Sequence, residues 1–247
     1  MAGLANAPLV PVWRNELGGL TWQLGDGPAR RFVKWSPAGT GPGLGREAVR
    51  LRWAARYSPV PTVLASGADV DGEWMVTAGL PGRSAVDPRW LGDPRPAVRA
   101  VGAGLRALHD ALPVSGCPFT WSAPHRVALA RDRARTSARP GAPEHADLSA
   151  AEVLARLDDV PDVDQLVVCH GDACAPNTLL TDDGAWTGHV DLGGMGVADR
   201  WADLAVATWS TQWNFGHGWE EPLLEAYGIA PDPVRTAYYR LLWDAGP

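Results

Sequence analysis

The 247-residue sequence predicts an α+β protein of two lobes, a β-rich N-terminal lobe followed by a larger, mainly helical C-terminal lobe. The first observation behind this prediction is that residues 13–80 form short apolar segments interrupted by glycine and proline, as strands and tight turns do. The second is that longer stretches with apolar residues at helical spacing follow. The length suits one large or two small domains, and we expect the lobes at residues 1–79 and 80–247.

The first expected strands surround glycine-containing turns. Residues 17–24, followed by Gly25–Pro28, predict a hairpin in which the glycines before Leu20 would let the backbone approach a phosphate group, although an ordinary turn explains these glycines as well. The next strand carries Lys34, the single lysine of the chain. Because a compact ammonium suits phosphate oxygens at sites where arginine is a poor substitute, we expect Lys34 to contact nucleotide phosphates.

A helix is expected to begin near Gly45 and to carry Glu47, thirteen residues after Lys34. Glu47 is the candidate partner that holds the lysine in place. An acidic residue in the first turn of a helix also suits the helix dipole without any further role. The strand expected at 73–78 then runs into the Gly/Pro-rich residues 79–82, where we place the boundary between the lobes.

The residues that suggest chemistry are concentrated in one loop. The apolar residues 167–169 lead into His170, and glycine and proline then break the pattern, which predicts a buried strand that opens into a loop. The loop has the form H-x-D-x-x-x-x-N, in which Asp172 would orient an attacking hydroxyl group and Asn177 would hold a metal ion. Asp191 suits the carboxylate that would hold the same metal ion from the other side. An aspartate in a loop usually caps a turn, but the combined spacing favours phosphoryl transfer.

These motifs resemble those of the aminoglycoside phosphotransferases, a family with a protein-kinase-like fold, and the 3′- and 3″-type enzymes most closely. The strongest similarity lies in residues 170–177, 188–193 and 196–205. Weaker similarity covers residues 80–82, 117–119 and 238–242.

The resemblance implies a nucleotide site between the lobes. Ala78 and Leu80 would contact the adenine through the backbone, and Thr77 would lie behind the base. Asp203, on a helix after the metal motif, would brace the catalytic loop. His109, at the end of the helix expected over residues 98–109, is expected to be a packed or capping histidine rather than a catalytic one.

The resemblance also implies an aminoglycoside acceptor, which clustered carboxylates hold in the kanamycin-type enzymes. The candidate acceptor contacts at the corresponding positions here are Glu144, Trp209, Ser210, Trp213 and Asp244. Tryptophan therefore stands where carboxylates are expected, at Trp209, Trp213 and Trp243, and Gly194 replaces an expected arginine. The tryptophans could stack on a ring of the acceptor or belong to the core. We expect poor activity on kanamycin-type substrates.

The charge and cysteine content of the sequence limit the binding partners and the cellular compartment that we expect. The 22 basic and 28 acidic residues give a net charge of −6, which argues against a nucleic-acid or membrane partner and favours a cationic ligand. Three widely spaced cysteines indicate free thiols, and hence a cytoplasmic protein. Residues 1–8 lack the features of a signal peptide, and no apolar run is long enough for a membrane span. The sequence leaves the oligomeric state open.

Two further segments have recognisable patterns. Residues 137–148 are rich in Pro, Gly, Ala and acidic residues, which predicts a mobile loop. Ser149 to Glu152 then form a capping box that opens another helix.

Taken together, the motifs predict a small-molecule O-phosphotransferase that uses Mg²⁺ and ATP, with GTP as the alternative nucleotide. Asp172 would accept the proton of the acceptor hydroxyl group or orient that group. A kinase of another hydroxylated small molecule would differ in its acceptor and not in its chemistry. A nucleotide-binding regulatory module without turnover is the alternative of another class, and it is disfavoured because no catalytic position is missing.

Overall fold

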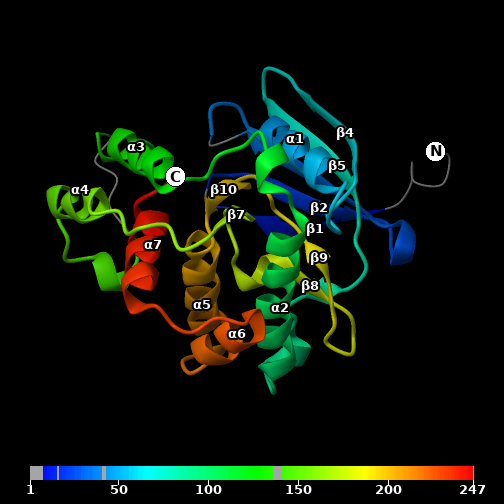
Figure 1. Cartoon of the computed structure of the whole chain (residues 1–247). Coiled ribbons are helices and arrows are strands. Elements are labelled where there is room, and N and C mark those ends of the chain that lie inside the picture. The colour runs from blue at the N-terminus through cyan, green and yellow to red at the C-terminus, as the bar shows by residue number, and fades with distance from the viewer. Residues whose placement is uncertain (1–7, 16, 41–42, 136–140, 247) are drawn as a thin grey trace.

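The computed structural model describes residues 8–15, 17–40, 43–135 and 141–246. The expectation of no signal peptide at the N-terminus, and part of the expected loop at 137–148, lie outside these residues. The two-lobed α+β architecture is confirmed. In Figure 1 the blue and cyan strands and helix α1 occupy the upper right of the view, and helices α4 to α7 lie to the lower left.

The N-terminal lobe is an antiparallel five-stranded sheet in the order β1-β2-β3-β5-β4. The strands are β1 (Leu9–Arg14), β2 (Leu20–Leu24), β3 (Arg31–Pro37), β4 (Val63–Ala68) and β5 (Gly72–Ala78). The expected hairpin joins β2 to β3, but β2 begins only at Leu20, because residues 17–19 belong to the turn after β1. Pairing of β3 with β5 places Lys34 opposite Met75, in the centre of the sheet.

Helix α1 (Leu44–Ala54) packs against this sheet and confirms the helix expected near Gly45. It buries Ala48, Leu51 and Ala54 in the core, whereas Val49 and Arg52 are exposed. Glu47 and Arg50 are also buried, although charged residues are almost never fully buried unless they are paired. Both side chains therefore require partners inside the molecule.

The C-terminal lobe is mainly helical. Its helices are α2 (Arg95–Ala111), α3 (Ala123–Ala134), α4 (Ala150–Asp158), α5 (Trp201–Phe215), α6 (Glu220–Tyr227) and α7 (Pro233–Ala245). Every residue from Trp201 to Thr211 is buried, so α5 is the central helix of this lobe. Helix α4 begins with the expected capping box of Ser149 and Glu152. Single 3-10 turns lie at Gly27–Ala29, Pro88–Trp90, Val114–Gly116, Pro143–His145 and Ala175–Asn177.

Two small sheets hold the motif-bearing loops. Strand β7 (Leu166–Cys169) pairs with β10 (Gly196–Asp199), and β8 (Thr178–Leu180) pairs with β9 (Trp186–His189) and with β6 (Arg83–Ser84). The loop at 170–177 therefore connects β7 to β8, and residues 190–195 connect β9 to β10. Because Thr178 faces His189 in the β8–β9 register, the two motif loops lie side by side. The division between the lobes at residues 79 and 80 stays a prediction, although the N-terminal sheet ends at Ala78.

No helix in the described part of the chain combines the length and the apolar character that crossing a lipid bilayer requires.

Candidate active site

The loop that follows β7 is fixed by hydrogen bonds of His170, which is fully buried. Its Nε2 lies 2.9 Å from the carbonyl oxygen of Val190, and its Nδ1 accepts the N–H of Asp172 at 3.2 Å. A carbonyl oxygen only accepts and a backbone N–H only donates, so these partners assign a neutral ring protonated on Nε2. His170 thereby ties the loop of Asp172 to the loop of Asp191.

Gly171 lets the two loops approach each other. Its φ of +89° lies in the region that favours glycine, and a Cβ there would lie 2.3 Å from the carbonyl carbon of Gly194. The second loop therefore leaves no space for a side chain at position 171.

The carboxylate of Asp172 is half-buried and receives hydrogen bonds on both oxygens. Asn177 donates from Nδ2 to Oδ2 at 3.2 Å and to the carbonyl oxygen of Asp172 at 2.9 Å. The thiol of Cys174 donates to Oδ1 at 3.1 Å. This arrangement suits a base that must hold one orientation toward an acceptor hydroxyl group.

Asn177 and Asp191 offer the donor atoms that a hard divalent cation requires. The two bonds donated by the Asn177 amide nitrogen fix the orientation of the amide, which leaves its oxygen available to a metal ion. The Asp191 carboxylate is 49 % exposed. Among the described residues, Asp191 is the one non-glycine residue with positive φ, at 63°. Carboxylate and amide oxygens fit Mg²⁺, so the residues present suit the implied metal.

Lys34 forms the expected pair with Glu47, with 2.8 Å between Nζ and Oε1, and it also contacts the Asp191 carboxylate. Burial favours the neutral amine, but the charges of Asp191 and Glu47 outweigh it and raise the pKa of Lys34. Partial loss of hydration opposes ionisation of Asp191, yet the Lys34 ammonium group holds the pKa of that carboxyl group below its usual range. Lys34 and Asp191 are therefore charged at neutral pH. Burial raises the pKa of Glu47, and the charge of Lys34 opposes that rise.

Asp203 braces the catalytic loop from below, as the family resemblance implied. It accepts the backbone N–H groups of His170 and Gly171, the latter at 2.9 Å, and the His109 ring at 3.0 Å. The other ring nitrogen of His109 lies 2.9 Å from the Tyr227 hydroxyl group. Burial acts to raise the pKa of Asp203, but the hydrogen bonds from the His109 ring and from the backbone of Gly171 lower it. His109 is thus a packed residue, as expected.

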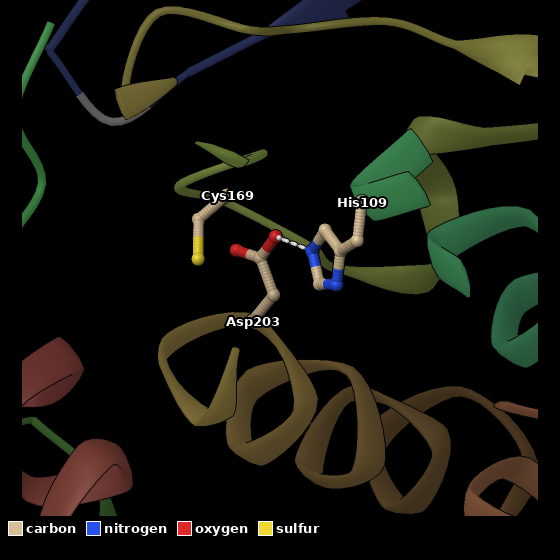
Figure 2. A group of neighbouring side chains, drawn as sticks. All are labelled: His109, Cys169 and Asp203. Carbon is tan, nitrogen blue, oxygen red and sulfur yellow. Dashed lines mark hydrogen bonds and ion pairs between the residues drawn. The ribbon is translucent and has the colours of Figure 1, made fainter. Parts of the chain in front are cut away.

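His109, Cys169 and Asp203 converge beneath the loop, as Figure 2 shows, at distances that would allow a metal ion. Their hydrogen bonds indicate otherwise. Both carboxylate oxygens already accept N–H groups, and the Cys169 thiol donates to the carbonyl oxygen of Asp199 at 3.3 Å. Burial raises the pKa of Cys169 well above its ordinary value, so the protonated thiol is a poor ligand. The cluster is a structural support for the loop.

The residues expected at the adenine lie at the end of β5 and just after it. Ala78 ends β5 and donates its N–H to the carbonyl oxygen of Thr62 at 2.9 Å. The carbonyl oxygen of Leu80 accepts a hydrogen bond from the guanidinium group of Arg30. Thr77 is buried, at 6 % exposure. The adenine contacts of Ala78 and Leu80 stay predictions.

Burial corrects the expectation that Trp209 and Ser210 contact the acceptor. Trp209 is 1 % exposed and Ser210 is fully buried, so neither side chain offers a surface to a ligand. Ser210 instead accepts the N–H of Ala175 in the catalytic loop at 2.9 Å. Trp213 is 49 % exposed and packs against Trp209 and Trp243, with ring centroids 4.9 and 5.6 Å apart.

The two remaining acidic candidates differ in what they can still bind. Glu144 is exposed and accepts the indole N–H of Trp209 at 3.0 Å. Asp244 accepts the backbone N–H of Gly141 at 2.8 Å and lies 2.7 Å from Nδ1 of His145. Although burial opposes it, these bonds hold the pKa of Asp244 below its ordinary value. Asp244 therefore holds the mid-chain loop, residues 141–148, against α7, and the hydrogen bonds from this loop already occupy its carboxylate.

A family model described as a phosphotransferase enzyme family matches residues 14–239. The chain belongs to this family. An aminoglycoside 3′-phosphotransferase of Streptomyces fradiae is 37 % identical over 94 % of this chain and 92 % of its own length. A streptomycin 3″-kinase of Streptomyces griseus is 36 % identical over 92 % of this chain and 88 % of its own.

Solved structures of phosphotransferases show the same architecture. An aminoglycoside-3′-phosphotransferase of type VIII superposes with a TM-score of 0.83 at 35 % identity, over 97 % of this chain and 93 % of that one. Aminoglycoside phosphotransferase APH(3″)-Id from Streptomyces rimosus, in complex with ADP and streptomycin, gives a TM-score of 0.77 at 30 % identity, over 98 % and 93 %. The protein-kinase-like fold inferred from the motifs is thereby confirmed.

Two side chains of this phosphotransferase site escaped the sequence prediction. Arg50 donates from Nε to the carbonyl oxygen of Met195 at 2.8 Å, and its guanidinium lies 4.7 Å from the centroid of the Phe119 ring. Its position one helical turn after Glu47 was a usable signal. Cys174 lies two residues after Asp172, but a thiol in a loop has no spacing that distinguishes it from a free cysteine.

Proposed function

We propose that this phosphotransferase transfers the γ-phosphoryl group of ATP to a hydroxyl group of an aminoglycoside. The observation that carries the proposal is the assembly of Asp172, Asn177, Asp191 and Lys34 from separate elements into one site. The names of the relatives at 36 and 37 % identity, a streptomycin 3″-kinase and an aminoglycoside 3′-phosphotransferase, support the acceptor class. The ADP bound to the Streptomyces rimosus enzyme supports an adenine nucleotide.

Each of the four residues has a distinct role in the proposal. Asp172 accepts the proton of the acceptor hydroxyl group or orients that group for in-line attack. Lys34, positioned by Glu47, contacts the nucleotide phosphates. Asn177 and Asp191 would hold Mg²⁺, and the bound cation would supply positive charge beside the phosphate oxygens. Ala78 and Leu80 provide the backbone that contacts the adenine.

Glu144 and Trp213 face the acceptor in this proposal, since both are exposed. Trp213 belongs to the tryptophan cluster formed with Trp209 and Trp243, and Glu144 is hydrogen-bonded to that cluster. A partly exposed tryptophan can stack on a ring of the acceptor, and an ionised carboxylate can pair with an ammonium group. The three cysteines are free thiols, which supports work in a reducing compartment such as the cytoplasm.

A kinase of another hydroxylated small molecule would use the same residues and would differ only in the acceptor. A regulatory nucleotide-binding module would not require a base whose carboxylate is held on both oxygens. The geometry at Asp172 therefore favours an enzyme over a module of this kind.

The test is a coupled nucleotide-turnover assay on the purified protein with Mg²⁺ and ATP, across varied aminoglycosides and other hydroxylated antibiotics. Mass spectrometry of the acceptor would identify the phosphorylated product. Asp172→Asn should lower turnover by roughly two to four orders of magnitude, the usual contribution of general-base assistance, with little change in nucleotide affinity. Near-normal turnover of this variant would sink the assignment, and nucleotide binding without transfer to any acceptor would favour the regulatory module.

A further inference from the structure

The carboxylate of Asp172 is connected to the central helix α5 through the thiol of Cys174, the backbone of Ala175 and the hydroxyl group of Ser210. Asn214 donates from Nδ2 to the hydroxyl oxygen of Ser210 at 3.1 Å. The same hydroxyl oxygen accepts the backbone N–H of Ala175 at 2.9 Å, and the thiol of the preceding residue, Cys174, donates to Oδ1 of Asp172 at 3.1 Å. Ser210 is fully buried, and Cys174 is partly buried.

The direction of each hydrogen bond follows from the donors present. The Ser210 oxygen accepts two N–H groups, from Asn214 and from the backbone of Ala175, so Ser210 holds the loop residue that directly follows Cys174. The thiol proton then points to the Asp172 carboxylate, which can only accept when ionised. Ser210 therefore fixes the backbone beside Cys174, and Cys174 contacts the carboxylate.

The thiol remains protonated in this environment. Burial raises the pKa of Cys174 well above its ordinary value, and the negative charge of Asp172 raises it further. A protonated thiol keeps the donor that the Asp172 oxygen requires.

We propose that Cys174 and Ser210 are positioning residues that, together with Asn214, fix the orientation of the Asp172 carboxylate. Asn177 holds one oxygen of the carboxylate and Cys174 holds the other, so the two contacts define both its plane and its direction. A base held in this way keeps its free lone pairs aimed at the acceptor hydroxyl group. The inference rests on the proposed role of Asp172 and extends it to residues that touch no substrate.

The experiment compares Cys174→Ala, which removes the donor, with Cys174→Ser, which replaces the thiol by another donor. Cys174→Ala should lower kcat about tenfold, less than the hundredfold that a 1 Å misplacement can cost, while KM for ATP and for the acceptor stays within about twofold. Cys174→Ser should recover kcat to within about threefold of the parent enzyme, because a hydroxyl group also donates to a carboxylate.

Ser210→Ala provides the second arm, and Cys117→Ala provides the control. Ser210→Ala should lower kcat by a similar factor, and its combination with Cys174→Ala should cost little more than either change alone, because Ser210 acts by fixing the backbone beside Cys174. Cys117 is a partly buried free thiol outside the loop, and its replacement should leave kcat unchanged.

Unchanged kcat in Cys174→Ala, in a preparation where Asp172→Asn abolishes transfer, would overturn the inference and leave the proposed function intact. An equal loss in Cys174→Ala and Cys174→Ser would also overturn it, since the loss would then reflect packing. If Asp172→Asn itself retained full activity, the proposed function would fail first. Should Ser210→Ala not fold, the two Cys174 variants decide the question alone.

Discussion

At the scale of single residues, the site depends on charges that hold one another in place. Lys34 lies between two carboxylates, and its ammonium group contacts both Glu47 and Asp191. Arginine elsewhere supplies every other basic side chain of the sequence. The guanidinium group is planar and larger than an ammonium group, so it cannot occupy the same point between the two carboxylates.

Lys34→Arg is therefore expected to impair transfer although the charge is kept. Loss of one charge-assisted hydrogen bond, about 1.5–3 kcal/mol, corresponds to roughly a ten- to hundredfold lower kcat/KM for ATP. Steady-state kinetics with ATP as the varied substrate would measure the change, and Arg52→Lys on the exposed face of α1 is the control. A kinetically silent Lys34→Arg would mean that the single lysine reflects compositional bias alone.

Asp191→Ala removes a carboxylate from the predicted metal site. We expect Mg²⁺-dependent nucleotide binding to be lost, because Asn177 alone leaves the cation with a single protein ligand. Titration of ATP by calorimetry, with and without Mg²⁺, would measure this. Equal Mg²⁺ dependence in the parent and the variant would contradict the assignment of Asp191.

Spacing along the sequence predicted the charged groups of the site, because phosphoryl transfer constrains which residue types stand at which separations. It left open whether Trp209 belongs to the core, and it did not predict that Ser210 would be buried. Substrate contacts were assigned from correspondence with relatives, and correspondence does not show which way a helix turns its side chains. Here α5 is buried on all sides over residues 201–211, so positions 209 and 210 both face the interior.

At the scale of elements, α1 is held to the C-terminal lobe by Arg50. Its Nε–H donates to the carbonyl oxygen of Met195, four residues after Asp191, while Glu47 on the same helix pairs with Lys34. The helix therefore links Lys34 to the segment that carries Asp191, the proposed metal ligand. The sequence predicted the helix and the pair, but the contact of Arg50 spans 145 residues and has no local pattern.

Arg50→Met keeps an apolar stem and removes the hydrogen bond. We expect KM for ATP to rise about three- to thirtyfold, with a smaller change in KM for the acceptor, because an unpaired buried carbonyl group costs about 1–3 kcal/mol and loosens α1. Arg52→Met, on the exposed face of the same helix, is the matched control. An equal rise in both Michaelis constants would indicate a general loss of structure and not a displaced helix.

Helix α5 supports the catalytic loop through Asp203, and Asp203→Asn should therefore destabilise the whole protein. Removing a fully buried carboxylate that accepts two backbone N–H groups and His109 should lower the free energy of unfolding by roughly 3–5 kcal/mol, measured by urea denaturation. Asp110→Asn, which breaks the exposed pair with Arg106, should cost about 1 kcal/mol or less.

The effect of Asp203 has a defined pH dependence. The pKa of Asp203 in the folded protein lies below the ordinary value of 3.8. The ionised carboxylate therefore contributes fully to the free energy of unfolding above pH 3.8, and this contribution is lost as the pH falls through the folded-state pKa. The difference in free energy of unfolding between the parent protein and Asp203→Asn should be constant near neutral pH and should shrink only below pH 3.8. A difference that began to shrink near pH 6 would assign the effect to another group.

At the scale of the whole molecule, a net charge of −6 favours a cationic acceptor, but the distribution of that charge limits which one. The carboxylate of Asp244 is occupied by the mid-chain loop, and Trp213 stands where the kanamycin-type enzymes are expected to have a carboxylate. Glu144 is the acidic candidate that remains exposed. Overall charge could be read from the sequence, whereas the occupation of Asp244 required the fold, because Gly141 and Asp244 are 103 residues apart.

We therefore expect poor activity on kanamycin-type acceptors and better activity on another aminoglycoside or a less cationic acceptor. Each missing carboxylate removes a charge-assisted hydrogen bond of about 1.5–3 kcal/mol, so several losses should raise KM for a kanamycin-type ligand by orders of magnitude. Efficient phosphorylation of kanamycin, with a micromolar KM, would show this interpretation of the acceptor site to be wrong.

Trp213→Glu tests the same argument in the opposite direction, because it returns one carboxylate to the exposed edge of the tryptophan cluster. KM for kanamycin should fall about tenfold or more, the equivalent of one such bond, while KM for ATP stays unchanged. Val234→Glu adds the same charge at a residue that is 70 % exposed on α7, away from the cluster, and should leave KM for kanamycin within about twofold. If both variants improved kanamycin binding equally, net charge would govern acceptor choice, and the side chain at position 213 would not.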